Sequence, residues 1–169
     1  VNGDDISFID SMIERIDNLI SWCREFGIYI ILDMHGAPGG QTGANIDDSK
    51  EDQPELYIND NFSNECIEMW GMLARRYSEE STIAGYDLLN EPLPEYHNSY
   101  NHKVIPLYRE IRNEIRKFDT KHILILEGVH WASDWSIFDE FDKDPFDHQY
   151  ILQFHKYWNN PDTPSIKTY

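Results

Sequence analysis

The chain has 169 residues, a length that suits one ordinary domain with a hydrophobic core, and 40% of its residues are apolar. Its 31 acidic residues against 14 basic ones give a formal net charge of -17. This charge argues against nucleic acid or an anionic membrane as a partner, because their phosphates would be repelled, and it suits a neutral substrate.

Helix-like and strand-like stretches alternate along the chain. Apolar residues at steps of three and four predict helices, and short, nearly continuous apolar runs predict strands buried on both faces of a parallel sheet. In chain order we expect a helix over 6–26, a strand over 28–34, a long loop over 35–60, a helix from Asn61 or Ser63, a strand over 83–89, a helix over 104–118, a strand over 123–127, a short helix over 135–141 and a strand over 150–155. The alternation implies right-handed crossovers and one α/β unit, without a linker or repeat.

Polar and aromatic residues follow the carboxyl end of each predicted strand. In chain order these residues are Asp33 and His35, then Asn90 and Glu91, then Glu127, His130 and Trp131, and last His155, Tyr157 and Trp158. Such strand ends lie on one rim in a (β/α)8 barrel and on one edge in a doubly wound sheet. We therefore expect these side chains to converge in space.

Glu91 is the candidate general acid/base, and Asn90 is the hydrogen-bonding group beside it. A buried glutamic acid can stay protonated near neutral pH and protonate a leaving oxygen. Pro92 disfavours the helical region for Glu91, so we expect extended backbone there. The alternative is a carboxylate that only stabilises a turn. Acid, amide, histidine and exposed tryptophan, without a metal-binding pattern or a phosphate-binding loop, suit a polyhydroxylated ring.

Three motifs resemble glycoside hydrolase family 5, the cellulase family. They are Asp33-Met34-His35-Gly36, Asn90-Glu91-Pro92 and His155-Lys156-Tyr157, each after a predicted strand and in the family's order. The resemblance covers essentially the whole chain and implies part of a (β/α)8 TIM barrel, with residues 1–169 as a single partial catalytic domain that holds about strands three to six. It also implies a β-glucan or related oligosaccharide as substrate and no cofactor or metal. The stretch 35–41 resembles the corresponding loop of exo-β-1,3-glucanase-like members.

The resemblance also implies roles for individual residues. Glu91 would be the proton donor and later the base of a retaining β-glycosidase, and Asn90 would bond the 2-hydroxyl of the sugar. The remaining substrate contacts would be His35 beside the scissile bond, His155 and Tyr157 beneath the reacting ring, and Trp131 and Trp158 as stacking platforms.

The chain departs from the family pattern in its second carboxylate. The family keeps its nucleophilic glutamate after the seventh strand, and neither that residue nor the family's arginine and late tryptophan has a counterpart here. We therefore expect the isolated chain to be inactive. Glu127 is interpreted as a rim or substrate contact. Four strands would leave two open edges, so self-association is possible.

The sequence leaves alternatives open for the function, the cysteines and the localisation. A catalytically inactive carbohydrate-binding protein on the same scaffold is the alternative function. Cys23 and Cys66 read as free buried thiols, although a disulfide is not excluded. We expect Trp22 and Trp70 in the core, His122 in solvent, and only weak potential for calcium at Asp47 and Asp48. Residues 1–5 show no signal-peptide pattern, so localisation is left unknown, although family members are commonly secreted.

Overall fold

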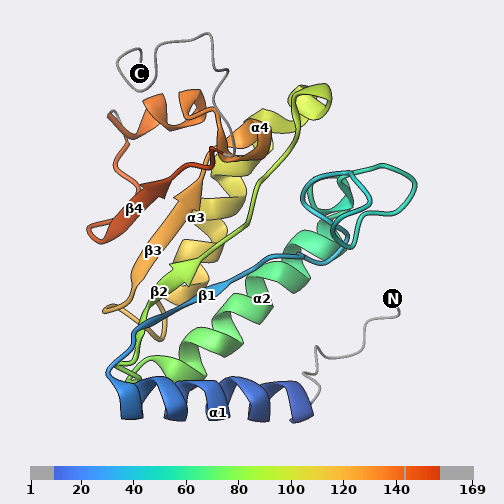
Figure 1. Ribbon diagram of the computed structural model, residues 1–169. Coiled ribbons are helices and arrows are strands. Elements are labelled where there is room, and N and C mark those ends of the chain that lie inside the picture. Colours follow the sequence, from blue (N-terminus) through green and yellow to red (C-terminus); the bar gives the residue numbers. More distant parts are fainter. Residues whose placement is uncertain (1–9, 143, 157–169) are drawn as a thin grey trace, which may run out of the picture.

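The computed structural model describes residues 10–142 and 144–156. Helices and strands alternate as the sequence predicts (Figure 1). In chain order the elements are α1 (Asp10–Phe26), β1 (Ile30–Asp33), η1 (Glu55–Tyr57), α2 (Asp60–Tyr77), β2 (Ile83–Asp87), η2 (Glu95–Lys103), α3 (Val104–Ile115), β3 (Ile123–Glu127), α4 (Val129–Ala132), η3 (Ser136–Asp142) and β4 (Tyr150–Gln153).

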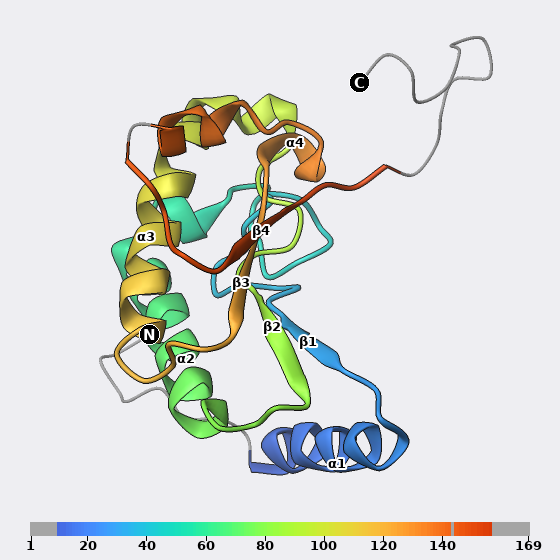
Figure 2. The ribbon, with the colours of Figure 1, turned by 90° about the vertical axis from the view of Figure 1, so that its left-hand side faces the viewer.

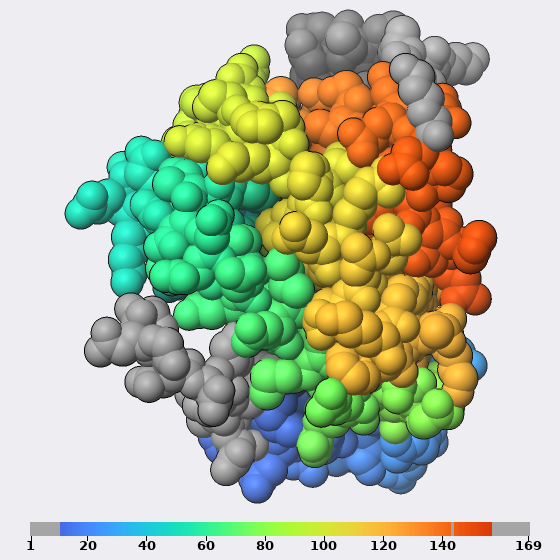
Figure 3. Space-filling view, turned by 180° about the vertical axis from the view of Figure 1, so that it is seen from behind, coloured from blue at the N-terminus to red at the C-terminus, as the bar shows by residue number. Residues whose placement is uncertain are grey.

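The four strands form one parallel sheet in the order β1-β2-β3-β4. Helices α2 and α3 connect consecutive strands and lie on the same side of the sheet, as Figure 2 shows edge-on and Figure 3 shows from the helix side. Parallel strands with crossover helices on one side are the arrangement of part of a (β/α)8 barrel, so the predicted fold class is confirmed.

The hydrophobic core lies between the sheet and helices α2 and α3. Tyr86 of β2 and Trp70 of α2 are both fully buried, and their ring centroids are 5.6 Å apart. The Trp70 indole N–H donates to the carbonyl oxygen of Leu88 at 3.1 Å, so this large ring buries no unsatisfied donor. The prediction that Trp70 belongs to the core is confirmed.

The other face of the sheet is open at its edges. Ile31 of β1 and Ile151 of β4 are 51% and 48% exposed, respectively. The expectation that the first strand is buried on both faces is therefore wrong for the residues that the structure describes. The physical reason is that helices cover only one face, so side chains that alternate along an edge strand alternate between core and solvent.

Helix α1 crosses the amino-terminal end of the sheet instead of running along it (Figure 1). Ile20 of this helix is buried in the core, and the Asp17 carboxylate accepts from Arg76 at 2.5 Å and from the Tyr77 hydroxyl at 2.9 Å. Of its apolar residues, Trp22 is 60% exposed and Phe26 is 73% exposed. The prediction of a core Trp22 is thus wrong, because an apolar stripe on a helix does not say which surface it will meet.

A buried polar cluster closes the amino-terminal end of β3. Asp119 accepts from the Tyr86 hydroxyl at 2.7 Å and lies 2.5 Å from His122 Nδ1. The hydrogen bond with Asp119 raises the pKa of His122, and hydrogen bonds from His122 and Tyr86 hold the pKa of Asp119 below its usual value although burial would raise it. His122 is buried, so the expectation of a solvated side chain is wrong.

The structure also bears on the two cysteines and on membrane-spanning helices. Cys23 and Cys66 are both free, which rules out a disulfide between them, and burial raises the pKa of the Cys66 thiol to about 12. Within residues 10–142 and 144–156, no helix combines the length and the apolar character that a bilayer crossing demands.

Arg116 joins α3 to the segments that precede β3 and β4. Its Nε and Nη2 donate to the two Asp147 carboxylate oxygens at 3.0 and 3.1 Å, and its Nη1 donates to the carbonyl oxygens of Asp119 and His122 at 3.0 and 2.9 Å. Only the planar guanidinium fork can make all these bonds at once.

We expect Arg116→Lys to lower the free energy of unfolding by about 1–3 kcal/mol, because the ammonium keeps the charge but leaves buried acceptors unpaired. Urea unfolding measures this change. The matched control is Arg76→Lys, whose pair with Asp17 is 49% and 40% exposed and should matter by less than about 0.5 kcal/mol. Equal losses in the two variants would contradict the assignment.

Candidate active site

Glu91 lies just beyond the carboxyl end of β2. After β2 ends, the chain stays paired with the residue that follows β1, since the Asn90 N–H donates to the Met34 carbonyl at 3.1 Å. Glu91 itself has φ 47°, so the expectation of extended backbone before Pro92 is wrong. A left-handed conformation at a non-glycine residue costs energy and persists only where its surroundings hold it, as often happens at functional sites.

Glu91, Glu127 and His155 form a closed ring of contacts. The Glu91 main-chain N–H donates to Glu127 Oε2 at 2.7 Å, and the Glu91 carboxylate Oε1 lies 2.8 Å from His155 Nδ1. The other imidazole nitrogen, Nε2, lies 3.2 Å from Glu127 Oε1. The ends of β2, β3 and β4 thus contribute one residue each, and the predicted convergence of Glu91 and His155 is observed directly.

Burial increases from Glu91 and His155 towards Glu127. The side chains of His155, Glu91 and Glu127 are 23%, 12% and 1% exposed, respectively. The interpretation of Glu127 as a rim or substrate contact is therefore wrong, because its carboxylate lies beneath the other two groups. Glu91 and His155 keep enough exposure for a ligand to reach them from the rim.

Gln153 and Asp87 form the floor under this ring. The Gln153 side-chain amide donates to Glu127 Oε1 at 2.7 Å and to Asp87 Oδ2 at 3.1 Å. Asp87 is 4% exposed, and its Oδ1 is buried without a hydrogen-bond partner. Sequence reasoning missed both residues, because each lies inside a predicted strand, 83–89 or 150–155, although in the structure β2 and β4 end at these residues.

The two buried acids, Asp87 and Glu127, differ in how many hydrogen-bond donors contact their carboxyl groups. Burial, and then the charges of Glu127 and Asp33, raise the pKa of Asp87 to about 9. Burial also raises the pKa of Glu127, but the Glu91 N–H, His155 and Gln153 oppose that rise. Glu127 has the larger set of donors, so we assign the proton to Asp87 and the charge to Glu127.

His35 occupies the neighbouring strand end. Its Nδ1 lies 2.8 Å from Asp33 Oδ2, and both residues are exposed. Buried Gln41 ties this motif to the Glu91 motif, because its side-chain N–H groups donate to the carbonyl oxygens of His35 at 3.0 Å and Asn90 at 2.9 Å. His35 and Asn90 are thus joined through a residue that sequence reasoning did not identify as part of the site.

Trp131 lies on a tight turn after β3. His130, Trp131 and Ala132 have φ values of 55°, 59° and 60°, three consecutive left-handed residues without a glycine. The turn is tied to both neighbouring loops: the His130 N–H donates to the Leu93 carbonyl at 2.7 Å, and the His155 N–H donates to the Ala132 carbonyl at 3.2 Å. Trp131 is half-buried beside the site. Tyr157 and Trp158, the other predicted contacts, lie outside the described residues.

The Asp47 and Asp48 carboxylates serve the loop that contains them. Asp47 accepts the main-chain N–H groups of Thr42 and Ser49 at 2.7 and 2.8 Å, and Asp48 accepts that of Gly39 at 3.1 Å. In the part of the chain that the structure describes, no three His, Cys, Asp or Glu side chains are grouped to hold a metal ion.

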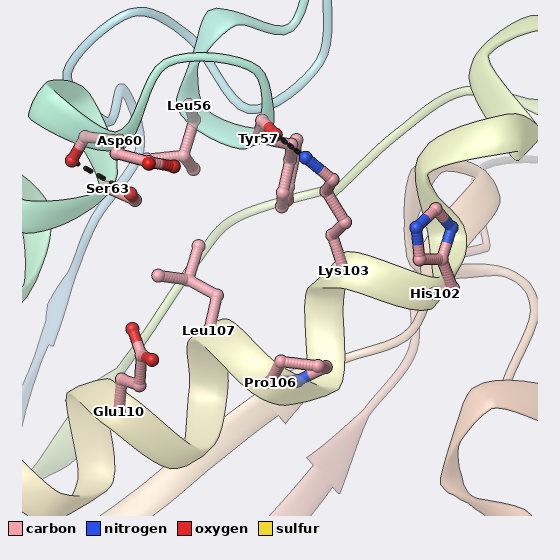
Figure 4. A pocket seen from close by; sticks show the side chains of 9 residues that line it. All are labelled: Leu56, Tyr57, Asp60, Ser63, His102, Lys103, Pro106, Leu107 and Glu110. Carbon is pink, nitrogen blue, oxygen red and sulfur yellow. Dashed lines mark hydrogen bonds between the residues drawn. The ribbon is translucent and has the colours of Figure 1, made fainter.

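A cavity of about 300 Å³ lies elsewhere, between the amino-terminal ends of α2 and α3. Figure 4 shows Lys103 at its wall, where the ammonium donates to the Tyr57 carbonyl at 2.6 Å. None of the strand-end residues lines this cavity. The candidate site residues therefore gather at the open rim of the sheet and not in this pocket between helices.

Comparison with known proteins agrees with this geometry. The family model described as cellulase (glycosyl hydrolase family 5) matches residues 1–165. A β-xylosidase of Phanerodontia chrysosporium is 35% identical over 130 residues, 77% of this chain and 26% of that protein. A probable glucan 1,3-beta-glucosidase A of Aspergillus fumigatus is 27% identical over 156 residues, 90% of this chain and 36% of that protein.

Solved structures share the fold. The β-glucanase SdGluc5_26A of Saccharophagus degradans, in complex with cellotetraose, superimposes with a TM-score of 0.69 at 24% identity, covering 94% of this chain and 44% of that one. The chain therefore spans less than half of the length of the proteins that it matches, and the likeness supports a partial (β/α)8 barrel.

The protonated state of Asp87 predicts an unusual pH dependence. In the unfolded chain this group ionises near pH ~3.9, whereas in the folded chain it keeps its proton up to about pH 9. Between these values folding takes up a proton, so stability falls as pH rises, by at most roughly 1.4 kcal/mol per pH unit. Asp87→Asn removes this proton. Urea unfolding at pH 5 and pH 8 measures the free energy of unfolding of both proteins. Relative to wild type, the variant should be more stable at pH 8 than at pH 5. A difference between the two proteins that does not change with pH would contradict the assignment.

Proposed function

We propose that this chain, which belongs to glycosyl hydrolase family 5, carries the general acid/base of a retaining β-glycosidase, and that Glu91 is that residue. Family membership gives a glycoside hydrolase-like function. The observation that supports the finer assignment is the Glu91 carboxyl group, which is 12% exposed at a strand end and bonded to His155 at 2.8 Å.

The geometry suits proton transfer in both directions. In the first step Glu91 would donate a proton to the glycosidic oxygen as the bond to the sugar breaks, and in the second it would take a proton from the attacking water. His155 lies beside the carboxylate that remains after the first step and can stabilise its charge. Asn90, held by Gln41 through its carbonyl oxygen, is proposed to bond the 2-hydroxyl of the sugar.

The nucleophile is proposed to come from outside the described residues. A retaining site needs a second carboxyl group about 5 Å from the first, on the other side of the sugar ring plane. Both oxygens of Glu127 are engaged by Glu91, Gln153 and His155 beneath the site, so Glu127 is not available for attack. We propose that residues 1–169 are one part of a single catalytic domain and that this part alone does not turn over substrate.

The proposed substrate is a β-linked oligosaccharide of neutral sugars. Relatives carry names of β-xylosidase and glucan 1,3-beta-glucosidase, and the matched β-glucanase binds cellotetraose. His35 and Trp131, with Tyr157 and Trp158, are proposed as substrate contacts. The net charge of -17 suits an uncharged ligand. Pairing of two copies through the edges of β1 and β4 stays a prediction that sedimentation can test.

Glu91→Gln tests the acid/base assignment in the whole protein to which this chain belongs. We expect kcat/KM on an unactivated β-glucan to fall by about 100-fold or more, because the leaving oxygen is no longer protonated. An aryl glycoside with a very acidic phenol needs no such proton, so its kcat/KM should change little.

Glu95→Gln is the matched control, since Glu95 is exposed in η2 just beyond the site and should leave both rates unchanged. Activity of Glu91→Gln on β-glucan equal to that of the wild type would refute the role of Glu91. Calorimetric binding of oligosaccharides by the wild type without any product would instead support a carbohydrate-binding protein.

A further inference from the structure

Glu127 makes an unusual pair of contacts with Glu91. Its Oε2 accepts the main-chain N–H of Glu91 at 2.7 Å, and its Oε1 lies 3.2 Å from the imidazole that holds the Glu91 side chain. We propose that Glu127 is a positioning residue that fixes the Glu91 carboxyl group from two directions, through its backbone and through His155. This inference rests on the proposed role of Glu91.

The backbone contact stabilises the left-handed conformation of Glu91. A non-glycine residue at φ 47° tends to relax towards commoner conformations unless something holds it. A charged acceptor makes the stronger kind of hydrogen bond, and the Glu127 carboxylate is 1% exposed, so water does not weaken the contact. The backbone at Glu91 sets the direction of its Cα–Cβ bond, so this hydrogen bond fixes where the side chain begins.

The imidazole contact fixes the other end of the side chain. His155 Nδ1 is hydrogen-bonded to Glu91 Oε1 at 2.8 Å, and its Nε2 lies 3.2 Å from both Glu127 Oε1 and the Gln153 side-chain nitrogen. A ring held at both nitrogens has little freedom to turn, so it presents the same nitrogen to Glu91.

Glu127 is itself rigidly held. The Gln153 amide donates to its Oε1 at 2.7 Å, and the Tyr108 hydroxyl of α3 donates to its main-chain carbonyl at 2.9 Å. The charged or titratable groups that face it are Asp87 on β2, Asp33 on β1 and His155 after β4. Because Asp87 keeps its proton, Glu127 can stay ionised without a second ionised carboxylate on β2 beside it.

A purely structural role makes a different prediction from a positioning role. If Glu127 only stabilised the fold, its loss would lower the amount of active protein and slow every substrate by the same factor. If it positions the acid, its loss should slow substrates in proportion to their need for a proton. The dependence of kcat/KM on the leaving group separates the two, because it compares substrates within one preparation.

The experiment compares Glu127→Gln with wild type in the whole protein, using phenyl and 2,4-dinitrophenyl β-glycosides. We expect kcat/KM to fall by about 100-fold for the phenyl substrate, as a misplaced catalytic group typically costs. The dinitrophenyl substrate, which needs no proton, should lose far less. Asp119→Asn is the matched control, because Asp119 is an equally buried carboxylate bonded to a histidine at the other end of β3. In this variant kcat/KM should change by the same factor for the phenyl and the dinitrophenyl substrate.

Glu127→Asp keeps the buried charge and guards against a variant that does not fold. The shorter side chain withdraws the acceptor from the Glu91 N–H, so a leaving-group-dependent loss is again expected. Equal losses on both substrates, or wild-type rates, in the folded variants would overturn the proposal. A Glu91→Gln variant that still cleaves β-glucan would instead overturn the proposed function itself, so the two failures are distinguishable.

Discussion

The Glu127 carboxylate, buried beneath the strand ends, is the constraint on which the site depends. An ionised group in this position needs partners of opposite polarity, and two neighbouring segments supply them. After β2 the Glu91 N–H donates to it, and at the end of β4 the Gln153 amide donates to it while His155 Nε2 lies 3.2 Å away. The loops after β2 and β4 are therefore drawn to one point by the same charge. The desolvation free energy of this buried carboxylate is offset by contacts that also bring together the groups proposed for catalysis.

Much of the fold could be predicted from local pattern. Periodicity and short apolar runs located every strand that the structure describes and its main helices, because these signals depend on neighbours in sequence. The errors concern what each element packs against. Trp22 is exposed because α1 crosses the end of the sheet, Ile31 because helices cover only one face, and His122 is buried because Asp119 and Tyr86 satisfy it. Apart from Asp119, which stands three residues before His122, these partners could not be read from the sequence around the residue.

The candidate site also contains some residues that could be predicted from the sequence and others that only the tertiary contacts reveal. Glu91 and His155 were identified because parallel strands bring their carboxyl ends together, which is a property of topology. Gln41, Asp87 and Gln153 were missed because their importance arises from contacts with other strands and loops. Glu127 was placed on the rim because its position at a strand end says nothing about depth, and the left-handed Glu91 backbone contradicts the preference that Pro92 imposes.

The open face of the sheet also has a graded chemistry along the strands. Ile31, Ile125 and Ile151 stand two residues nearer the amino ends than Asp33, Glu127 and Gln153, on the same face. The proposed sugar substrate, entering from the rim, would exchange its water for hydrogen bonds in the polar layer, whereas a hydroxyl group pushed deeper would meet aliphatic carbon and lose its partners. Solvation would then limit the depth that the proposed substrate can reach.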